Sequence, residues 1–456
     1  MREGPGKTRT RRTGGQKEKR NGKNMPEILI IGAGAAGLMA AVFASRSGAS
    51  VTVAEHNEKP GKKIYLTGKG RCNVTNDCGL EDFLREVPRN PRFLYSALSF
   101  FSPQDMIALL EENGCPVEIQ RGRRAYPRSM KASDVTKTLT EICRRQGVRF
   151  LMNREAAALR LESGQESAEC AAERDGAPAS GRRVTGVEMR DGSFLPADRV
   201  ILATGGLSYP STGSTGDGLR MAREAGHTVT PLLPSLVGLE AAEAWPAELQ
   251  GLSLKNVRIT LRSGKKTLYT ELGEMLFTHF GFSGPLILEA SCHLPEEGKP
   301  CRLELDLKPG LTPEMTEARL LRELEAGAKK QLKNILPSLL PGRLAEVFPR
   351  LCGLPETLAC NQISAAQRRS LAERLKCLPL EIRGRRPFSE AVVTRGGVSV
   401  REVQPGTMES KIAKGLYFAG EMLDVDAHTG GYNLQIAFST GALAGYSSAR
   451  PSPETR

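Results

Sequence analysis

The stretch ILIIGAGAAGLMAAVFASRSGASVTVAE, residues 28–55, decides the fold of this chain. Its first four residues are apolar and predict a buried strand, and the alanine-rich run after them predicts a helix. Between the two lie Gly32, Gly34 and Gly37 in the pattern GxGxxG. The first glycine permits the tight turn, the second lets a pyrophosphate approach the backbone, and the third lets helix and strand pack closely. The segment therefore predicts a βαβ unit that binds an adenine dinucleotide at the helix N-terminus.

An acidic residue completes this pattern. Glu55 ends the second predicted strand, 23 positions after Gly32. A carboxylate there can accept hydrogen bonds from both ribose hydroxyls, and it would repel a 2′-phosphate, which disfavours NADP in this site. We expect His56, the next residue, to share in binding.

Two later glycine-rich segments favour FAD over NAD. The run GLYFAGE, residues 415–421, predicts a strand end that returns to the cofactor, and GGYN, residues 430–433, precedes the last predicted helix. The N-terminus of that helix would stabilise the negative charge that collects on the flavin on reduction. The run ATGG, residues 203–206, follows another apolar strand and predicts a third close approach of backbone to the cofactor.

The order of predicted elements indicates an α/β fold with one long insertion. We expect a discontinuous Rossmann-like FAD-binding domain formed by residues 25–206 and 388–449. We expect residues 207–387 to form an inserted substrate domain, β-rich over about 230–308 and helical over about 312–376.

Composition is that of a globular protein, with 39% hydrophobic and 25% charged residues. The net charge of +13 arises in large part from residues 1–24, which hold nine Lys or Arg and two Glu. With no apolar residue beyond Met1, this tail is expected to be disordered, either inert or in contact with an acidic surface. We expect a cytoplasmic protein with no membrane span, no metal site and reduced cysteines. Nucleic acid is not expected as a partner despite the tail.

Three runs of sequence closely resemble the BaiN-like family of bacterial flavoproteins. They are KPGKK with GKGRCNVTN (residues 59–63 and 68–76), FTHFGFSGP (277–285), and GEMLDVD with GGYNLQ (420–426 and 430–435). The resemblance implies FAD and an insertion that is β-barrel-like with a helical part. The family includes bile-acid ene-reductases and aminoacetone oxidases. Ala427 and His428 depart from the Gly and Arg expected after Asp426.

From these motifs we predict the residues that bind the cofactor. They are Gly32, Ala33, Gly34, Ala35, Ala36, Gly37, Glu55, His56, Lys62, Lys63, Arg71, Cys72, Asn73, Thr204, Gly205, Gly420, Glu421, Asp424, Gly431, Tyr432, Asn433 and Leu434. For Cys72 the alternatives are a reactive thiolate beside Arg71 and a packing cysteine. For Lys62 and Lys63 they are phosphate neutralisation and solvated loop charges.

Reduction of an activated C=C bond needs a group that polarises the carbonyl and an acid that protonates the α-carbon. Three motif residues are candidates: Tyr209, His279 and Arg395. His279 is expected in a loop that begins a helix, where it binds substrate or braces the loop. Tyr209 either faces the site or packs at the domain seam, and Arg395 either binds substrate or forms an interdomain ion pair.

Three functions remain open at this point. The first is an FAD-dependent reductase of an enone, such as a 3-oxo-Δ4,6 bile-acid intermediate of 7-dehydroxylation, with NADH or NADPH as a transient electron donor. The second is an oxidase of a small amine such as aminoacetone. The third is a flavin-containing binding protein. In the first two cases the partner is a small-molecule substrate.

Overall fold

The computed structural model describes residues 25–163, 181–296 and 299–450. The predicted disordered tail lies outside them. At the centre is a five-stranded parallel sheet in the order β20-β10-β1-β2-β6. Its strands are β1 (Glu27–Ile31), β2 (Ser50–Glu55), β6 (Arg149–Met152), β10 (Arg199–Leu202) and β20 (Leu416–Phe418). Ile28 pairs with Val51 on one side and Arg199 on the other, so segments far apart in sequence form one sheet.

Two helices cover the sheet beside the glycine turn. Helix α1 (Ala35–Arg46) packs directly against α13 (Tyr432–Ser448). A Cβ at Gly441 would lie 2.2 Å from the carbonyl oxygen of Ala36, and one at Gly445 would lie 2.1 Å from that of Ala40. Glycine at these two positions lets the helices approach closely. The contact places Gly441 beside the start of α1, so the N-terminal part of α13 extends past the glycine turn to Thr75.

Smaller elements surround this core. Helices α4 (Pro103–Glu112) and α5 (Ala132–Arg145) pack with a small sheet of β3 (Thr75–Asn76), β5 (Arg124–Pro127) and β4 (Val117–Gln120). Helix α3 (Tyr95–Phe100) packs against α13, and α2 (Leu80–Arg85) packs against α3. A second small sheet is formed by β19 (Ala413–Lys414), β8 (Arg182–Met189), β7 (Ala156–Ser163) and β9 (Phe194–Pro196). No helix of the described residues is long and apolar enough to cross a membrane.

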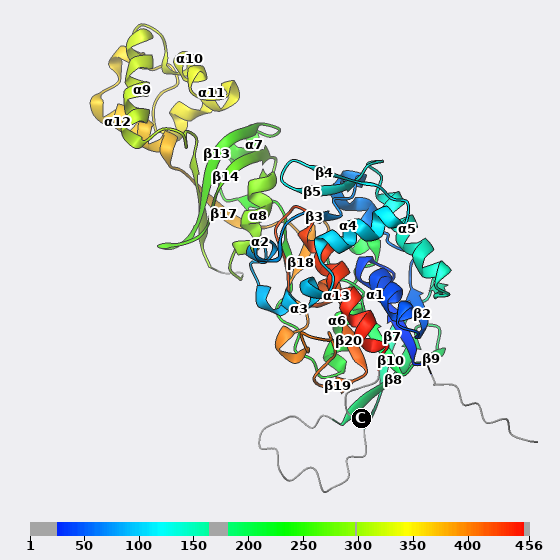
Figure 1. Cartoon of the computed structure of the whole chain (residues 1–456). Helices are drawn as coiled ribbons and strands as arrows, with labels where there is room; N and C mark the ends of the chain where they lie inside the picture. Colours follow the sequence, from blue (N-terminus) through cyan, green and yellow to red (C-terminus); the bar gives the residue numbers. More distant parts are fainter. Residues whose placement is uncertain (1–24, 164–180, 297–298, 451–456) are drawn as a thin grey trace, which may run out of the picture.

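The insertion contains a closed barrel in the order β12-β15-β14-β13-β16-β17. Its strands are β12 (Leu239–Ala241), β13 (Ser253–Ser263), β14 (Lys266–Thr278), β15 (Gly281–Ser283), β16 (Cys301–Asp306) and β17 (Leu378–Arg385). Alternate residues of β16, such as Leu303 and Leu305, point into a second hydrophobic core. Beyond the barrel, on the side away from the parallel sheet, lie α9 (Pro313–Ala326), α10 (Leu332–Ile335), α11 (Gly342–Leu351) and α12 (Ala365–Lys376) (Figure 1).

A two-stranded ribbon joins the two parts. The chain leaves along β11 (Leu233–Ser235) and returns along β18 (Val393–Arg395), which pair antiparallel. The predicted fold class, a Rossmann-like domain with an inserted barrel and helices, is confirmed. The predicted start of the insertion at residue 207 stays a prediction. Helix α6 (Asp217–Glu224) packs into the core of the parallel sheet, which favours a later start, near β11.

Candidate active site

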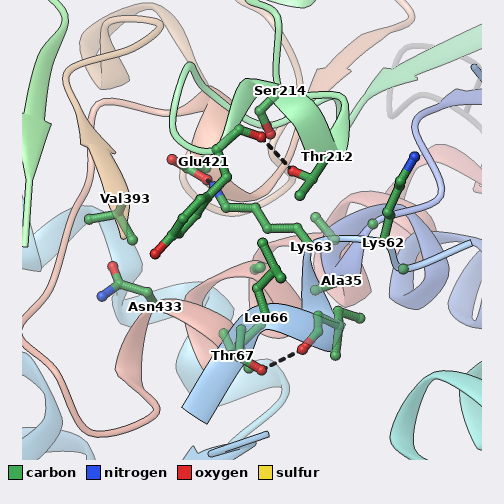
Figure 2. Close-up of a pocket in the computed structure, with 18 of the residues that line it drawn as sticks. Ala35, Lys62, Lys63, Leu66, Thr67, Thr212, Ser214, Val393, Glu421 and Asn433 are labelled. Atoms are coloured by element: carbon green, nitrogen blue, oxygen red, sulfur yellow. Dashed lines mark hydrogen bonds and ion pairs between the residues drawn. The ribbon is translucent and has the colours of Figure 1, made fainter. Parts of the chain in front are cut away.

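A cavity of about 590 Å³ opens at the carboxyl ends of β1, β2 and β10. Both parts of the fold contribute to its lining, which includes the glycine turn, residues 61–69, the ATGG segment, the N-terminus of α13 and the start of α8 (Pro285–His293). Figure 2 shows side chains converging on it from several elements, with Lys63 extending across the middle toward Glu421. Open α/β sheets bind their ligands at this edge.

The glycine turn has the geometry that the sequence predicts. Gly32 has φ +99°, and a Cβ there would lie 2.6 Å from the carbonyl oxygen of Ala203. A Cβ at Gly37 would lie 1.8 Å from the carbonyl oxygen of Gly32. A Cβ at Gly34 would meet nothing within 4 Å. Gly34 thus leaves open space beside the N-terminus of α1, where backbone N–H groups can receive a phosphate.

Glu55 is buried at the end of β2 and organises the neighbouring loop. Its Oε2 accepts a 2.7 Å hydrogen bond from the Ala33 N–H, and its Oε1 accepts bonds from the backbone and side chain of Asn57. His56 and Asn57 line the cavity beside it, and both lie against Gly213, where a Cβ would contact them. This end of the cavity suits an adenosine ribose.

Lys63 and Glu421 form an ion pair within the cavity lining. Lys63 Nζ lies 2.7 Å from Glu421 Oε2 and also donates to the Ser208 hydroxyl. Glu421 Oε1 accepts from Ser208 Oγ and from the backbone N–H of Thr394, so the pair links β18 to the sheet. Burial favours a higher pKa for Glu421, but the charge and hydrogen bond of Lys63 outweigh it and hold the pKa below its ordinary value.

The N-terminus of α13 closes the far side of the cavity. Gly431 is its N-cap, with φ +100°, and Asn433 and Leu434 in its first turn line the cavity. Thr204 and Gly205 face it from the ATGG segment. Asn73 also lines the cavity, and its buried Oδ1 has no hydrogen-bond partner within the described chain. A buried acceptor of this kind calls for a ligand donor.

These residues fit FAD. The two helix N-termini, the open face of Gly34, the carboxylate of Glu55 and the orphan acceptor of Asn73 provide groups for a pyrophosphate, a ribose and a polar ring edge. Ala35, Ala36 and Lys62 also line the cavity, whereas Ala33 and Gly37 lie outside its lining. Bound FAD would supply two-electron, hydride-transfer chemistry.

Some predicted cofactor residues lie outside the cavity lining, because neighbours in a motif can point to different sides. Arg71 stacks on Tyr126, and Cys72 is buried, with its thiol pKa raised to about 12 by burial. Gly420 packs against α1. Asp424 pairs with Arg89, and Tyr432 packs edge-on against Phe83 at 5.1 Å. The structure therefore gives these five residues other neighbours than the cofactor.

The three predicted catalytic residues are not brought together. Tyr209 lines the cavity. His279 is exposed in the turn between β14 and β15, and the expected helix begins only at Pro285, so His279 lies outside the cavity lining. Arg395 lies outside it as well and donates through Nη1 to the carbonyl oxygens of Cys292 and Leu294. The catalytic role of each remains a prediction, and only Tyr209 has the position that it requires.

Sequence reasoning missed one wall of the cavity. It is formed by Leu236, Pro285, Leu288, Val392, Val393, Val425, His428 and Thr429. Five of these residues come from α8, from the ribbon or from positions directly beside the ribbon, and the apolar residues there carry no motif. The signal that could have identified His428 was its departure from the family pattern.

Known proteins resemble this chain over almost its whole length. The family described as HI0933-like protein Rossmann domain matches residues 26–447. A 3-dehydro-bile acid delta(4,6)-reductase from Clostridium scindens is 33% identical over 431 residues, covering 93% of this chain and 99% of the relative. A ribosomal RNA dihydrouridine synthase from Haemophilus influenzae is 32% identical over 433 residues, covering 93% and 98%. One from Escherichia coli is 29% identical over 419 residues, covering 91% and 96%.

The match to the family spans both halves of the parallel sheet and the whole insertion. It confirms the family expected from the sequence motifs. The chain belongs to the HI0933-like family of Rossmann-domain proteins.

Proposed function

We propose that this protein is an FAD-dependent oxidoreductase acting on CH–CH groups, an ene-reductase that reduces a C=C bond conjugated to a carbonyl. The observation that carries the proposal is the single cavity shared by the dinucleotide site and the apolar wall of the insertion. A substrate on that wall would lie in the same cavity as the flavin. NADH or NADPH is the proposed transient electron donor.

The first proposed substrate is a steroid enone, such as a 3-oxo-Δ4,6 bile acid. Leu236, Leu288, Val393 and Val425 give the wall an apolar character suited to a steroid. Val392 also lines the cavity and is 37% exposed, so it offers apolar surface to an entering ligand. The relative from Clostridium scindens, named a 3-dehydro-bile acid delta(4,6)-reductase, supports this substrate.

A second candidate substrate is uridine within RNA, whose C5=C6 bond is also conjugated to a carbonyl. Basic residues beside the cavity favour it. Lys69 and Arg124 line the cavity and are exposed, and Arg121 and Arg123 are exposed in the same turn between β4 and β5. Such a cluster suits phosphate contacts. The two relatives named ribosomal RNA dihydrouridine synthase support this candidate.

Anaerobic stopped-flow spectroscopy of the yellow protein tests the proposal. The flavin is reduced with NADH or NADPH, and the reduced protein is then mixed with 3-oxochola-4,6-dien-24-oic acid or with a uridine-containing fragment of ribosomal RNA. Reoxidation by either acceptor supports ene-reduction and identifies the substrate class. Bleaching of the oxidised flavin by aminoacetone, with no response to either acceptor, would establish the amine-oxidase alternative instead.

A double variant separates the two substrates. Arg123→Ala with Arg124→Ala removes two exposed charges next to the cavity. We expect reoxidation by the RNA to become at least tenfold slower at low salt if the phosphate backbone binds there, because each phosphate contact adds to affinity. Reoxidation by the steroid should change less than twofold. The matched control is Arg183→Ala, an exposed arginine of β8 that lies outside the cavity lining.

A further inference from the structure

A groove lies on the helical part of the insertion, apart from the cavity at the parallel sheet. Its lining comes from the loop after β16, from α9 and from residues 338–339. Figure 1 shows α9 beyond the barrel, on the side away from the parallel sheet. No described residue lines both the groove and the cavity. A ligand of the groove is therefore separate from the cofactor and from a substrate held in the cavity.

Three cations line the groove, and no Asp or Glu of the described residues does. Lys308 lies in the loop after β16, while Arg319 and Arg322 lie three positions apart on α9 and so share one side of the helix. Arg319 has a carboxylate partner, Glu323, at 2.7 Å. Within the described chain, neither Lys308 Nζ nor the Arg322 guanidinium is paired with a carboxylate. The groove thus presents positive charge that the protein does not neutralise.

The charge of Lys308 is held at a cost. Its side chain is half-buried, although no carboxylate of the described residues pairs with it. Burial, followed by the positive charge of Arg319, lowers the pKa of Lys308. Both effects disfavour the charged amine in the protein as it stands. An anion in the groove would offset both, because it would replace lost solvation and attract the two cations.

Lys376 holds the loop of Lys308 in place. Its Nζ donates to the carbonyl oxygens of Lys308 and Leu311, at 2.8 and 2.6 Å, and to Asp306 Oδ2 at 2.7 Å. The other carboxylate oxygen, Asp306 Oδ1, accepts from the backbone N–H of Lys308 at 2.8 Å. Asp306 is therefore engaged with Lys376 and with the backbone. A loop fixed in this way loses little conformational entropy when a ligand binds.

The net charge of the chain is concentrated in the same part of the insertion. The first 24 residues carry +7 of the net +13, which leaves +6 for the rest. Residues 308–376 alone carry +5, with twelve Lys or Arg against seven Asp or Glu. Such a surface attracts polyanions. No aromatic residue lines the groove within the described chain, so it suits the phosphates of a nucleic acid better than its bases.

We propose that this groove binds phosphate groups of an RNA backbone. The inference rests on the proposed RNA substrate. The forked guanidinium groups of Arg319 and Arg322 match the oxygens of a phosphate, and Lys308 adds a compact positive charge. The barrel lies between the groove and the parallel sheet (Figure 1), so a steroid in the cavity cannot occupy both sites, whereas an RNA can extend to both. The groove then holds one stretch of the RNA while another stretch enters the cavity.

An RNA that cannot be reduced tests the groove without turnover. The probe is a short fluorescent oligo(A), which lacks the C5=C6 bond of uracil, titrated with the oxidised, flavin-loaded protein and followed by fluorescence anisotropy. Lys308→Gln with Arg322→Gln removes the two cations that lack a carboxylate partner. We expect the Kd to rise about tenfold in 100 mM salt. The slope of log affinity against log salt should fall by about 1.4, since each phosphate contact to a single strand adds about 0.7.

The matched control is Lys265→Gln with Lys266→Gln. These two exposed lysines lie at the hairpin between β13 and β14, outside the groove, and their loss changes the net charge equally. The control should change the Kd less than twofold. An equal rise in both double variants would show that only net charge matters and overturns the inference. So does unchanged binding in the groove variant, or no binding of oligo(A) by the wild-type protein.

Two further probes test other occupants of the groove. Binding of fluorescent polyglutamate without binding of oligo(A) would identify an acidic protein as the partner and overturns the inference. Displacement of oligo(A) by low millimolar inorganic phosphate, at constant ionic strength, would show a site for a free anion and also overturns it.

The same binding data separate the inference from the proposed function. If neither the steroid nor the RNA reoxidises the reduced flavin, the proposed function fails, and oligo(A) binding still decides whether the groove holds RNA. If RNA reoxidises the flavin but the groove variant binds oligo(A) as tightly as wild type, only the inference fails.

Discussion

Replacing Lys63 by Met tests whether its ion pair with Glu421 governs the electrostatics of the cavity. The two charges lie 2.7 Å apart, and their side chains are only 26% and 19% exposed. Removing one partner of a buried pair costs about 3–5 kcal/mol, because the other charge is left unpaired. Glu421 keeps its bonds from Ser208 and Thr394. We therefore expect the free energy of unfolding to fall by less, about 2–3 kcal/mol at pH 7.

The pH dependence should also change sign. A folded-state pKa that is lowered, as for Glu421, gives stability that is present above the unfolded pKa of about 4.3 and is lost as pH falls through the folded pKa. Without Lys63, burial becomes the dominant effect and raises the pKa of Glu421. The contribution of Glu421 is then greatest at low pH and is lost as pH rises past about 4.3.

Thermal unfolding of the flavin-free protein, followed by circular dichroism from pH 4 to pH 7.5, measures both effects. The matched control is Lys62→Met. Lys62 also lines the cavity, but its partners are Asn57 and Glu58, and Glu58 is 59% exposed. Its loss should cost less than about 1 kcal/mol. Equal effects of the two variants, or an unchanged pH dependence in Lys63→Met, would refute the reasoning.

Three further predictions concern single positions. Gly34→Ala should leave the flavin-free protein as stable as wild type but lower the ratio of flavin to protein absorbance. Gly37→Ala should lower both the stability and that ratio, because a Cβ at Gly37, unlike one at Gly34, meets backbone atoms. His279→Asn should change unfolding free energy by less than about 0.5 kcal/mol, measured by urea titration, since the side chain is exposed. Burial raises the pKa of Asp426 to about 6, although the hydrogen bond from Ser235 and the nearby arginines act to lower it. The free energy of unfolding therefore falls as pH rises toward 6. Asp426→Asn should remove this dependence, worth up to about 3 kcal/mol in the same titration repeated at pH 4 and pH 7.

The sequence predicts the dinucleotide half of the site well because its signals are local. The turn needs positive φ at Gly32, and the helix packs against the turn at Gly37. Both requirements select glycine, and the two positions lie within six residues of each other. Glu55 follows from the length of one βαβ unit. The return of the chain at residues 415–421 is predicted for the same reason, since that strand ends in a glycine-rich turn.

The wall of the cavity beside the insertion could not be predicted, because its contacts are between distant segments. His428 meets His293 across 135 positions, and Thr429 meets Glu289 across 140. Neither pair follows a period or spacing. His279 was placed wrongly in a loop that begins a helix, because the glycines that follow it, Gly281 and Gly284, suit a hairpin turn equally well. The tight turn into β15 forms because β15 pairs with β14 in the closed barrel. Closure of a barrel depends on residues that are far apart in the sequence.

The ribbon of β11 and β18 affects how the inserted segment can change during evolution. Because the polypeptide departs and comes back on adjacent, paired strands, the two covalent connections of residues 236–392 to the rest of the chain lie side by side. A segment joined in this way can be lengthened, shortened or exchanged without rewiring the parallel sheet. Evolution can thus keep one flavin-binding domain and replace the inserted segment that lies beside it.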